Sequence, residues 1–226
     1  MLRTDLKMAL RHVRRHRGYT FLNAFGLAVG LACCMLILLF VRHERSYDRF
    51  HERADRIYRV VDDEYKEGGI HVHSAATPAR LATELAEDPA VERTVRFLRY
   101  GVFTTPLVGR DAREKHLEPD FFFADSTVFD VFSFPLLSGD PRTALAAPFT
   151  VVLTESTARR YFGGEDAVGR TLTFENRFDF TVTGVMADLP SNTHVQFDFL
   201  GSFASLGRIE GDWIYRYWNW PPSFRS

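Results

Sequence analysis

The longest uninterrupted apolar stretch of the chain lies near its N-terminus. Residues 18–41 read GYTFLNAFGLAVGLACCMLILLFV and contain no Asp, Glu, Lys, Arg or His. A helix of this length reaches about 36 Å, enough to cross the roughly 30 Å hydrocarbon core of a bilayer. The stretch is longer than the apolar region of a signal peptide, and it does not end in small residues. A buried helix of a soluble protein rarely runs this long without a charge. We therefore predict an uncleaved transmembrane helix over residues 18–41.

Weaker patterns of both helical and strand period follow this stretch. Alternating or continuous apolar runs predict strands, and Thr77-Pro78, Asp125 and Thr154 are placed to begin short helices. Asn176-Arg177 separates two alternating runs, which predicts a hairpin. The intermingled elements indicate an α+β domain whose core is built largely from its phenylalanines. The predicted helices are 42–57, 77–85, 125–132 and 154–162, and the predicted strands are 56–61, 91–100, 101–108, 149–153, 171–175 and 178–185.

Charge is distributed unequally on the two sides of the predicted span. Residues 1–17 carry six basic side chains and one acidic side chain, with apolar residues at helical spacing among them. This pattern predicts either an amphipathic helix on the inner leaflet or a simple cationic flank. The positive-inside rule places residues 1–17 in the cytoplasm and residues 42–226 outside it. Residues 42–226 hold 22 basic and 28 acidic side chains, a net charge of −6 that argues against nucleic acid as a partner.

One side of the predicted span carries small and weakly polar residues at three- and four-residue steps. Gly26 and Gly30 form a GxxxG pattern, which permits close approach of a second helix. We predict a helix-packing face there, consisting of Asn23, Gly26, Gly30, Cys33 and Cys34. The two cysteines are adjacent, so a structural disulfide between them is not expected. Residues 42–226 contain no cysteine, so that domain depends on its hydrophobic core.

Motifs that carry chemistry are weak in this chain. Residues 164–171, GEDAVGRT, nearly fit a phosphate-binding loop, but Arg170 replaces the lysine, and the predicted order of helix and strand is reversed. His71 and His73 lack further ligands at zinc spacing, and we expect them in an exposed loop. The acidic run 62–64 lacks the spacing and the glycine of a calcium loop, and no GxSxG is present. We predict no catalytic, cofactor-binding or metal-binding residue.

Several strings match the MacB/FtsX-type ABC transporter permeases in order. They include LKMALRH at 6–12, GYTFLNAFGLAVGLACC at 18–34, ERSYDRFHERADRIYRV at 44–60, FDVFSFPLLSGDP at 129–141 and VLTESTARRYFG at 152–163. The chain thus resembles this family over about residues 1–205.

The resemblance implies an N-terminal span, an extracytoplasmic core domain and three later spans. It also implies a second permease copy and a cytoplasmic ATPase subunit as partners, together with membrane lipid and an adaptor or substrate in the periplasm. Such permeases pass ATP-driven motion to the outer domain and act on antimicrobial peptides, macrolides or lipoproteins. Because the chain stops after IYRYWNWPPSFRS, we expect an incomplete gene product.

The expected location is the bacterial inner (plasma) membrane. The alternatives are a single-pass sensor or ligand-binding module and a membrane-anchored extracytoplasmic hydrolase.

Overall fold

A computed structural model describes residues 15, 17–66, 69–101, 105–110 and 114–211. The chain divides into two compact units, Met1–Tyr47 and Asp48–Ser226. The predicted amphipathic segment over residues 1–17 lies almost wholly outside the described residues, as does the aromatic stretch after Gly211.

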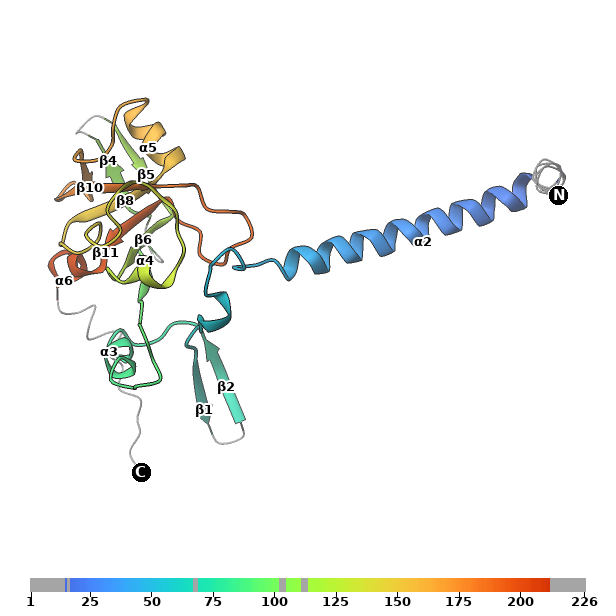
Figure 1. Ribbon diagram of the computed structural model, residues 1–226, viewed down its shortest axis with the longest axis horizontal. Coiled ribbons are helices and arrows are strands. Elements are labelled where there is room, and N and C mark those ends of the chain that lie inside the picture. The colour runs from blue at the N-terminus through green and yellow to red at the C-terminus, as the bar shows by residue number, and fades with distance from the viewer. Residues whose placement is uncertain (1–14, 16, 67–68, 102–104, 111–113, 212–226) are drawn as a thin grey trace. The chain divides into compact units, whose positions relative to one another are not determined.

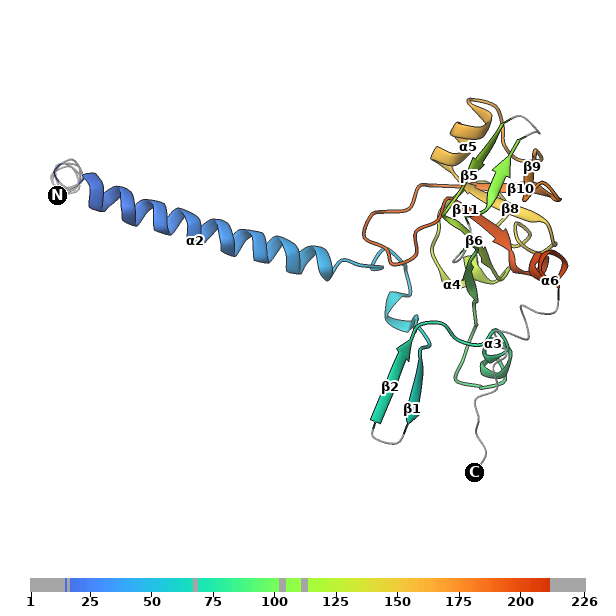
Figure 2. The ribbon, with the colours of Figure 1, turned by 180° about the vertical axis from the view of Figure 1, so that it is seen from behind.

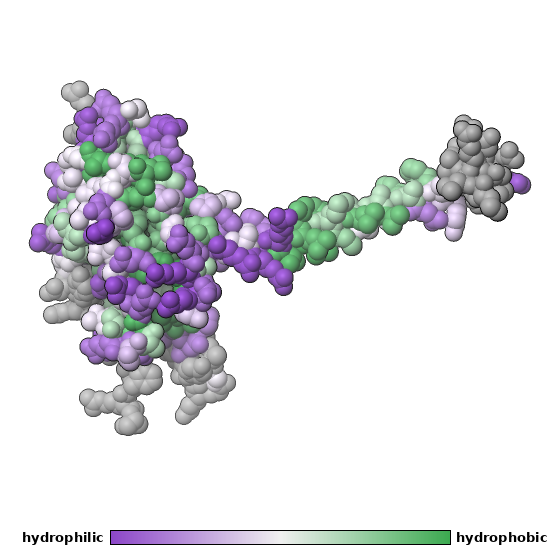
Figure 3. Space-filling view, in the orientation of Figure 1, coloured by the Kyte–Doolittle hydropathy of each residue, from purple (hydrophilic) through white to green (hydrophobic). Residues whose placement is uncertain are grey.

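The first unit is built on one long helix, α2 (Arg17–Glu44). None of its 28 residues is buried, and Figure 3 shows a continuous hydrophobic surface along most of its length. By length and composition it could cross a membrane, the one such helix in the described part of the chain. The sequence prediction of a helix over 18–41 is therefore confirmed.

The predicted charged helix over 42–57 is wrong. The chain leaves helical structure after Glu44 and forms turns, followed by only the short 3-10 helix η1 (Ala54–Arg56). Asp48 adopts a left-handed backbone with φ of 54°, which an α-helix cannot contain. Contacts with sequence-distant residues hold that conformation, so the local charge pattern could not predict it.

The second unit contains a nine-stranded mixed sheet with the order β3-β6-β11-β8-β10-β9-β4-β5, and β7 also pairs with β10 (Figures 1 and 2). The β6–β11 and β8–β10 pairs are parallel, and the other pairs are antiparallel. The strands are β3 (Phe97–Arg99), β4 (Leu107–Gly109), β5 (Lys115–Leu117), β6 (Phe121–Ala124), β7 (Leu136–Gly139), β8 (Thr150–Thr154), β9 (Thr171–Phe174), β10 (Phe178–Met186) and β11 (Phe199–Ser202). A separate hairpin consists of β1 (Asp62–Lys66) and β2 (Gly69–Ser74).

Short helices complete the α+β domain and confirm the predicted fold class. They are α3 (Leu81–Leu85), α4 (Val128–Val131), α5 (Glu155–Phe162), η2 (Phe203–Ser205) and α6 (Leu206–Ile209). Helix α5 follows β8 directly and ends at Gly163, whose φ of 66° suits glycine. These features confirm the predicted strand over 149–153 and the helix that follows it.

The predicted hairpin over 171–185 is also confirmed. Strands β9 and β10 pair from Phe174 opposite Phe178 to Thr171 opposite Thr181. Glu175 and Asn176 in the connection both have positive φ, as the turns that suit the twist of antiparallel strands require.

Aromatic side chains fill the core, as predicted. Phe121, Phe123, Phe174, Phe180 and Phe199 have at most 2% of their surface exposed and contact one another across the sheet. Burial of each such ring contributes about 2–3 kcal/mol of hydrophobic stabilisation. A second buried cluster includes Phe134, Phe197, Leu200 and Met186.

Five other predicted elements differ from the structure in position, length or capping. The strand predicted over 56–61 is absent, and β1 begins only at Asp62. The strands predicted over 91–100 and 101–108 shorten to β3 and β4. The helix predicted from Thr77-Pro78 begins at Leu81. Asp125 does not cap α4 with its side chain, because its carboxylate instead pairs with Arg96 at 2.7 Å.

Candidate functional site

The five residues of the predicted helix-packing face all lie on α2 and are exposed in this single helix. A Cβ added at Gly26 or Gly30 would meet nothing within 4 Å. Both positions therefore have room for a neighbouring helix, and the packing role of Asn23, Gly26, Gly30, Cys33 and Cys34 stays a prediction.

A second candidate site lies where the outer domain begins. We call residues 48–53 the junction segment, because they follow the end of α2 and are the first residues of the second compact unit. The side chains and backbone of this segment bind two parts of the domain that are distant in sequence, the loop over 192–194 and the segment over 132–134.

Asp48 makes the contacts to the loop over 192–194. Its carboxylate accepts hydrogen bonds from the Thr193 hydroxyl at 2.6 Å and from the His194 backbone N–H at 3.1 Å. It also contacts the His194 ring Nδ1 at 2.6 Å, and the Asp48 N–H donates to the Asn192 carbonyl at 3.0 Å. Four interactions thus converge on one residue, which explains why its left-handed backbone is retained.

His51 makes the contacts to the segment over 132–134. Its ring is 5% exposed and lies against Phe50, Phe132 and Phe134, with ring centroids 3.9–5.3 Å away. The Ser133 backbone N–H donates to His51 Nδ1 at 3.1 Å. This bond requires the Nδ1 atom to be unprotonated, so the buried ring is neutral in this arrangement.

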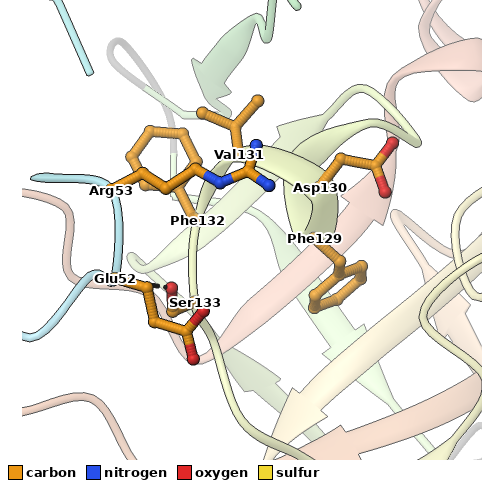
Figure 4. Close-up of a pocket in the computed structure, with 7 residues that line it drawn as sticks. All are labelled: Glu52, Arg53, Phe129, Asp130, Val131, Phe132 and Ser133. Carbon is orange, nitrogen blue, oxygen red and sulfur yellow. Dashed lines mark hydrogen bonds between the residues drawn. The ribbon is translucent and has the colours of Figure 1, made fainter. Parts of the chain in front are cut away.

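The next two residues of the junction segment line a polar pocket of about 270 Å³. The Glu52 N–H donates to the Ser133 hydroxyl at 3.0 Å (Figure 4). Arg53 extends along the pocket in the same view, and its guanidinium pairs with Glu92 at 3.1 Å. The remaining lining comes from the backbone and side chains of residues 129–133.

The environment of the junction segment shifts the pKa of two of its groups. Burial opposes ionisation of the Asp48 carboxyl, but the hydrogen bonds from Thr193 and His194 outweigh it and lower its pKa below the usual 3.8. Burial also lowers the pKa of His51 below the usual 6.5, and the nearby Asp48 charge offsets part of that shift. At neutral pH the segment therefore combines a charged carboxylate with a neutral buried imidazole.

Another polar cluster lies under α5 and serves the fold. Glu118 is 2% exposed, accepts from the Tyr161 hydroxyl at 2.8 Å and pairs with Arg160 at 3.1 Å. Burial, followed by the hydrogen bond to Glu118, raises the pKa of the Tyr161 hydroxyl. Burial also raises the pKa of the Asp198 carboxyl, and the positive charge of Arg160 offsets part of that shift. The buried carboxylate thus has partners for both oxygens, which its desolvation requires.

The motifs considered in the sequence occupy ordinary structural positions. Residues 164–170 connect the end of α5 to the start of β9, so the phosphate-loop order is indeed reversed. His71 and His73 lie on strand β2 and not in a loop, which corrects that expectation, and His73 contacts Asp63 of β1. Asp62 and Asp63 begin β1. Within the described ranges, no group of three His, Cys, Asp or Glu side chains is arranged to hold a metal ion.

Reasoning from individual residues did not identify the junction segment. Its partners, Thr193 and His194, lie about 145 positions away, and no periodicity connects them. The available signal was the string ERSYDRFHERADRIYRV, which contains Asp48 and His51 and carries part of the family resemblance.

Comparisons with known proteins agree with that resemblance. The family model for the MacB-like periplasmic core domain matches residues 20–218. A solved domain of a proposed permease protein from Porphyromonas gingivalis is 26% identical, with a TM-score of 0.52. The similarity covers 59% of this chain and 60% of that one, so it spans less than two thirds of the relative.

Two more distant structures were also found. The periplasmic region of MacB from Actinobacillus actinomycetemcomitans is 16% identical, with a TM-score of 0.47 and coverage of 66% of this chain and 65% of that chain. The extracellular domain of the noncanonic ABC-type transporter YknZ from Gram-positive bacteria is 15% identical, with a TM-score of 0.44 and coverage of 58% and 65%. No curated protein sequence matches the chain.

Proposed function

Since this chain belongs to the family of MacB-like periplasmic core domains, we propose that it is the N-terminal part of an ABC transporter permease that couples cytoplasmic ATP hydrolysis to motion of an extracytoplasmic domain. The observation that carries the proposal is the family match over residues 20–218, which begins within α2 and continues through the outer domain. Residues 18–41 span the bacterial inner (plasma) membrane, residues 1–17 are cytoplasmic and residues 42–226 are extracytoplasmic.

In this proposal, the junction segment transmits motion between the span and the outer domain. Only Arg45, Ser46 and Tyr47 separate the last helical residue, Glu44, from Asp48. A connection this short has little slack, so displacement of the helix end pulls directly on the contacts of Asp48 and His51. Those contacts lead to the loop over 192–194 and to Ser133, and thus reach two parts of the domain that are distant from the junction segment in sequence.

The proposed partners follow from this role. A separate cytoplasmic ATPase subunit supplies the energy, and a second permease copy packs against the Asn23, Gly26, Gly30, Cys33 and Cys34 face. Membrane lipid surrounds the span, and the outer domain contacts a periplasmic adaptor or the substrate itself. The proposed activity is export or extraction of substrates such as antimicrobial peptides, macrolides or lipoproteins. Chemical conversion of the substrate is not part of the role.

Affinity isolation of the protein from its native membranes tests the proposal. A tagged protein, solubilised in mild detergent, should bring down an ABC ATPase in a fixed ratio, and the isolated complex should hydrolyse ATP. A matched sample in which the lysine of the ATPase phosphate loop is replaced by alanine should retain the complex and lose hydrolysis. Isolation without any ATPase would contradict the proposal. Recovery of a signalling protein in its place would support a sensor.

A further inference from the structure

The junction segment is held to the outer domain by two anchors of different chemistry. At one anchor, the Asp48 carboxylate accepts hydrogen bonds from the loop over 192–194. At the other, the ring of His51 accepts the Ser133 backbone N–H at Nδ1, at 3.1 Å. The first acceptor is an ionised carboxylate and the second is a neutral imidazole, so added protons affect the two anchors at different pH values.

The His51 anchor exists only while the ring is neutral. Acceptance at Nδ1 places the single ring proton on Nε2, so a second proton would have to occupy Nδ1 and face the Ser133 N–H, donor against donor. The ring is 5% exposed and lies against Phe50, Phe132 and Phe134. An imidazolium in this position would exchange its water for phenyl rings, which costs free energy. Protonation therefore opposes the present seating of the ring.

Burial outweighs the charges around His51. The Asp48 charge favours protonation of the ring, but burial opposes it more strongly and lowers the pKa of His51 below the usual 6.5. The segment over 132–134 reads FSF and faces the ring with no ionisable side chain. The other ionisable groups that the junction segment and its two binding partners bring to this region are Arg49, Glu52, Arg53, Asp130 and His194.

The Asp48 anchor keeps its contacts in mild acid. Burial raises the pKa of Asp48, but the hydrogen bonds from Thr193 and His194 outweigh it and hold the pKa below 3.8, so the carboxylate stays charged at about pH 5. The His194 ring contacts the same carboxylate through Nδ1, which can carry a proton both in a neutral tautomer and in the imidazolium. Acid therefore acts on one anchor and leaves the other in place.

We infer that the junction segment is an acid-sensitive switch, in which acid outside the cell loosens His51 from residues 132–134 while Asp48 stays bound to the loop over 192–194. The inference rests on the proposed function for the extracytoplasmic position of the domain and for its coupling to the span. With His51 seated, displacement of the helix end reaches both parts of the domain. After its release, the Glu52 N–H bond to the Ser133 hydroxyl is a remaining polar link to that segment, and the transmitted motion passes mainly through Asp48.

Hydrogen exchange of the detergent-solubilised full chain at about pH 7 and about pH 5 tests the switch, with labelling times scaled for the intrinsic pH dependence of amide exchange. The peptide that covers residues 128–134 should exchange about tenfold faster at the lower pH, the equivalent of one lost hydrogen bond. The ceiling is about 25-fold, because the released ring titrates at its usual pKa of 6.5. Peptides over 190–196 and over β9 and β10 should keep their protection.

Three variants assign the response to His51. His51→Phe keeps an aromatic ring but cannot titrate and offers Ser133 no acceptor, so residues 128–134 should exchange quickly and equally at both pH values. His51→Asn keeps a short-range acceptor oxygen that does not titrate in this range, so it should protect residues 128–134 better than His51→Phe and equally at both pH values. His194→Asn is the matched control and should retain the pH response of residues 128–134.

Three results would overturn the inference. One is equal protection of residues 128–134 at both pH values in the unaltered chain, which leaves the proposed function intact if an ABC ATPase still isolates with the protein. Another is a pH response that persists in His51→Phe, because a different group would then titrate. The third is loss of protection at 190–196 together with 128–134, because acid would then release both anchors. The expected exchange pattern without any ATPase would refute the permease proposal and support the local switch.

Discussion

Replacing Asp48 with alanine should release the loop over 192–194 from the junction segment. The substitution removes three contacts of the carboxylate, to the Thr193 hydroxyl, the His194 N–H and the His194 ring. The Asp48 side chain is 38% exposed, so solvent screens these interactions, and the three contacts together contribute about 2 kcal/mol. Alanine at a φ of 54° adds about 1 kcal/mol of backbone strain. The total is about 3 kcal/mol.

The backbone and hydrogen-bond contributions can be separated by two further variants. Asp48→Gly loses the same bonds without the strain, so it should cost about 2 kcal/mol. Asp48→Asn tolerates the left-handed backbone and keeps one acceptor oxygen, so it should cost about 1 kcal/mol. The expected order of destabilisation is therefore alanine, then glycine, then asparagine.

Hydrogen exchange of the detergent-solubilised chain measures this local opening. Exchange of the peptide that covers residues 190–196 should accelerate about 100-fold in Asp48→Ala and about 30-fold in Asp48→Gly, since about 1.4 kcal/mol corresponds to tenfold. A peptide from β9 and β10 should be unchanged and serves as the internal control. Unchanged exchange at 190–196 in all three variants would refute the assignment of Asp48 as an anchor of the junction.

Three further predictions concern other parts of the chain. Burial lowers the pKa of His51 below 6.5, so the stabilisation from its neutral form is complete above pH 6.5 and is lost as the pH falls through the lowered value. Urea unfolding from about pH 7 to about pH 5 should show this loss of stability, and His51→Phe should make the stability less dependent on pH. A Cβ at Gly201 would lie 2.9 Å from the Phe123 ring, so Gly201→Ala should cost about 1–3 kcal/mol in thermal unfolding, whereas Gly164→Ala, which meets nothing within 4 Å, should change little. Gly30→Leu should weaken association of the span in a membrane reporter assay by about 1–2 kcal/mol, while a leucine at Ala32 should not.

Sequence alone identified the elements whose signals are local. A run of 24 residues without charge predicted α2, because crossing lipid imposes a length and a composition that can be counted. The hairpin around Asn176 and the helix that ends at Gly163 were also predicted, since each has its own turn residue. The buried phenylalanines were predicted because aromatic side chains dominate cores.

The candidate junction site could not be predicted in this way. The charge pattern after Glu44 suited a helix, yet Asp48 follows the geometry imposed by Thr193 and His194. Asp125 was a plausible helix cap from its position, but Arg96, 29 residues earlier, binds its carboxylate. In each case a partner distant in sequence outweighs the local preference, and a single sequence does not record that pairing.

The central claim is that the outer domain lies across the membrane from the N-terminus, and thiol labelling in intact spheroplasts tests it most directly. In the Cys33→Ser, Cys34→Ser background, an impermeant maleimide should label Leu137→Cys at once and label Met8→Cys only after the membrane is permeabilised. Labelling of Met8→Cys in intact spheroplasts, with Leu137→Cys protected until permeabilisation, would contradict the account.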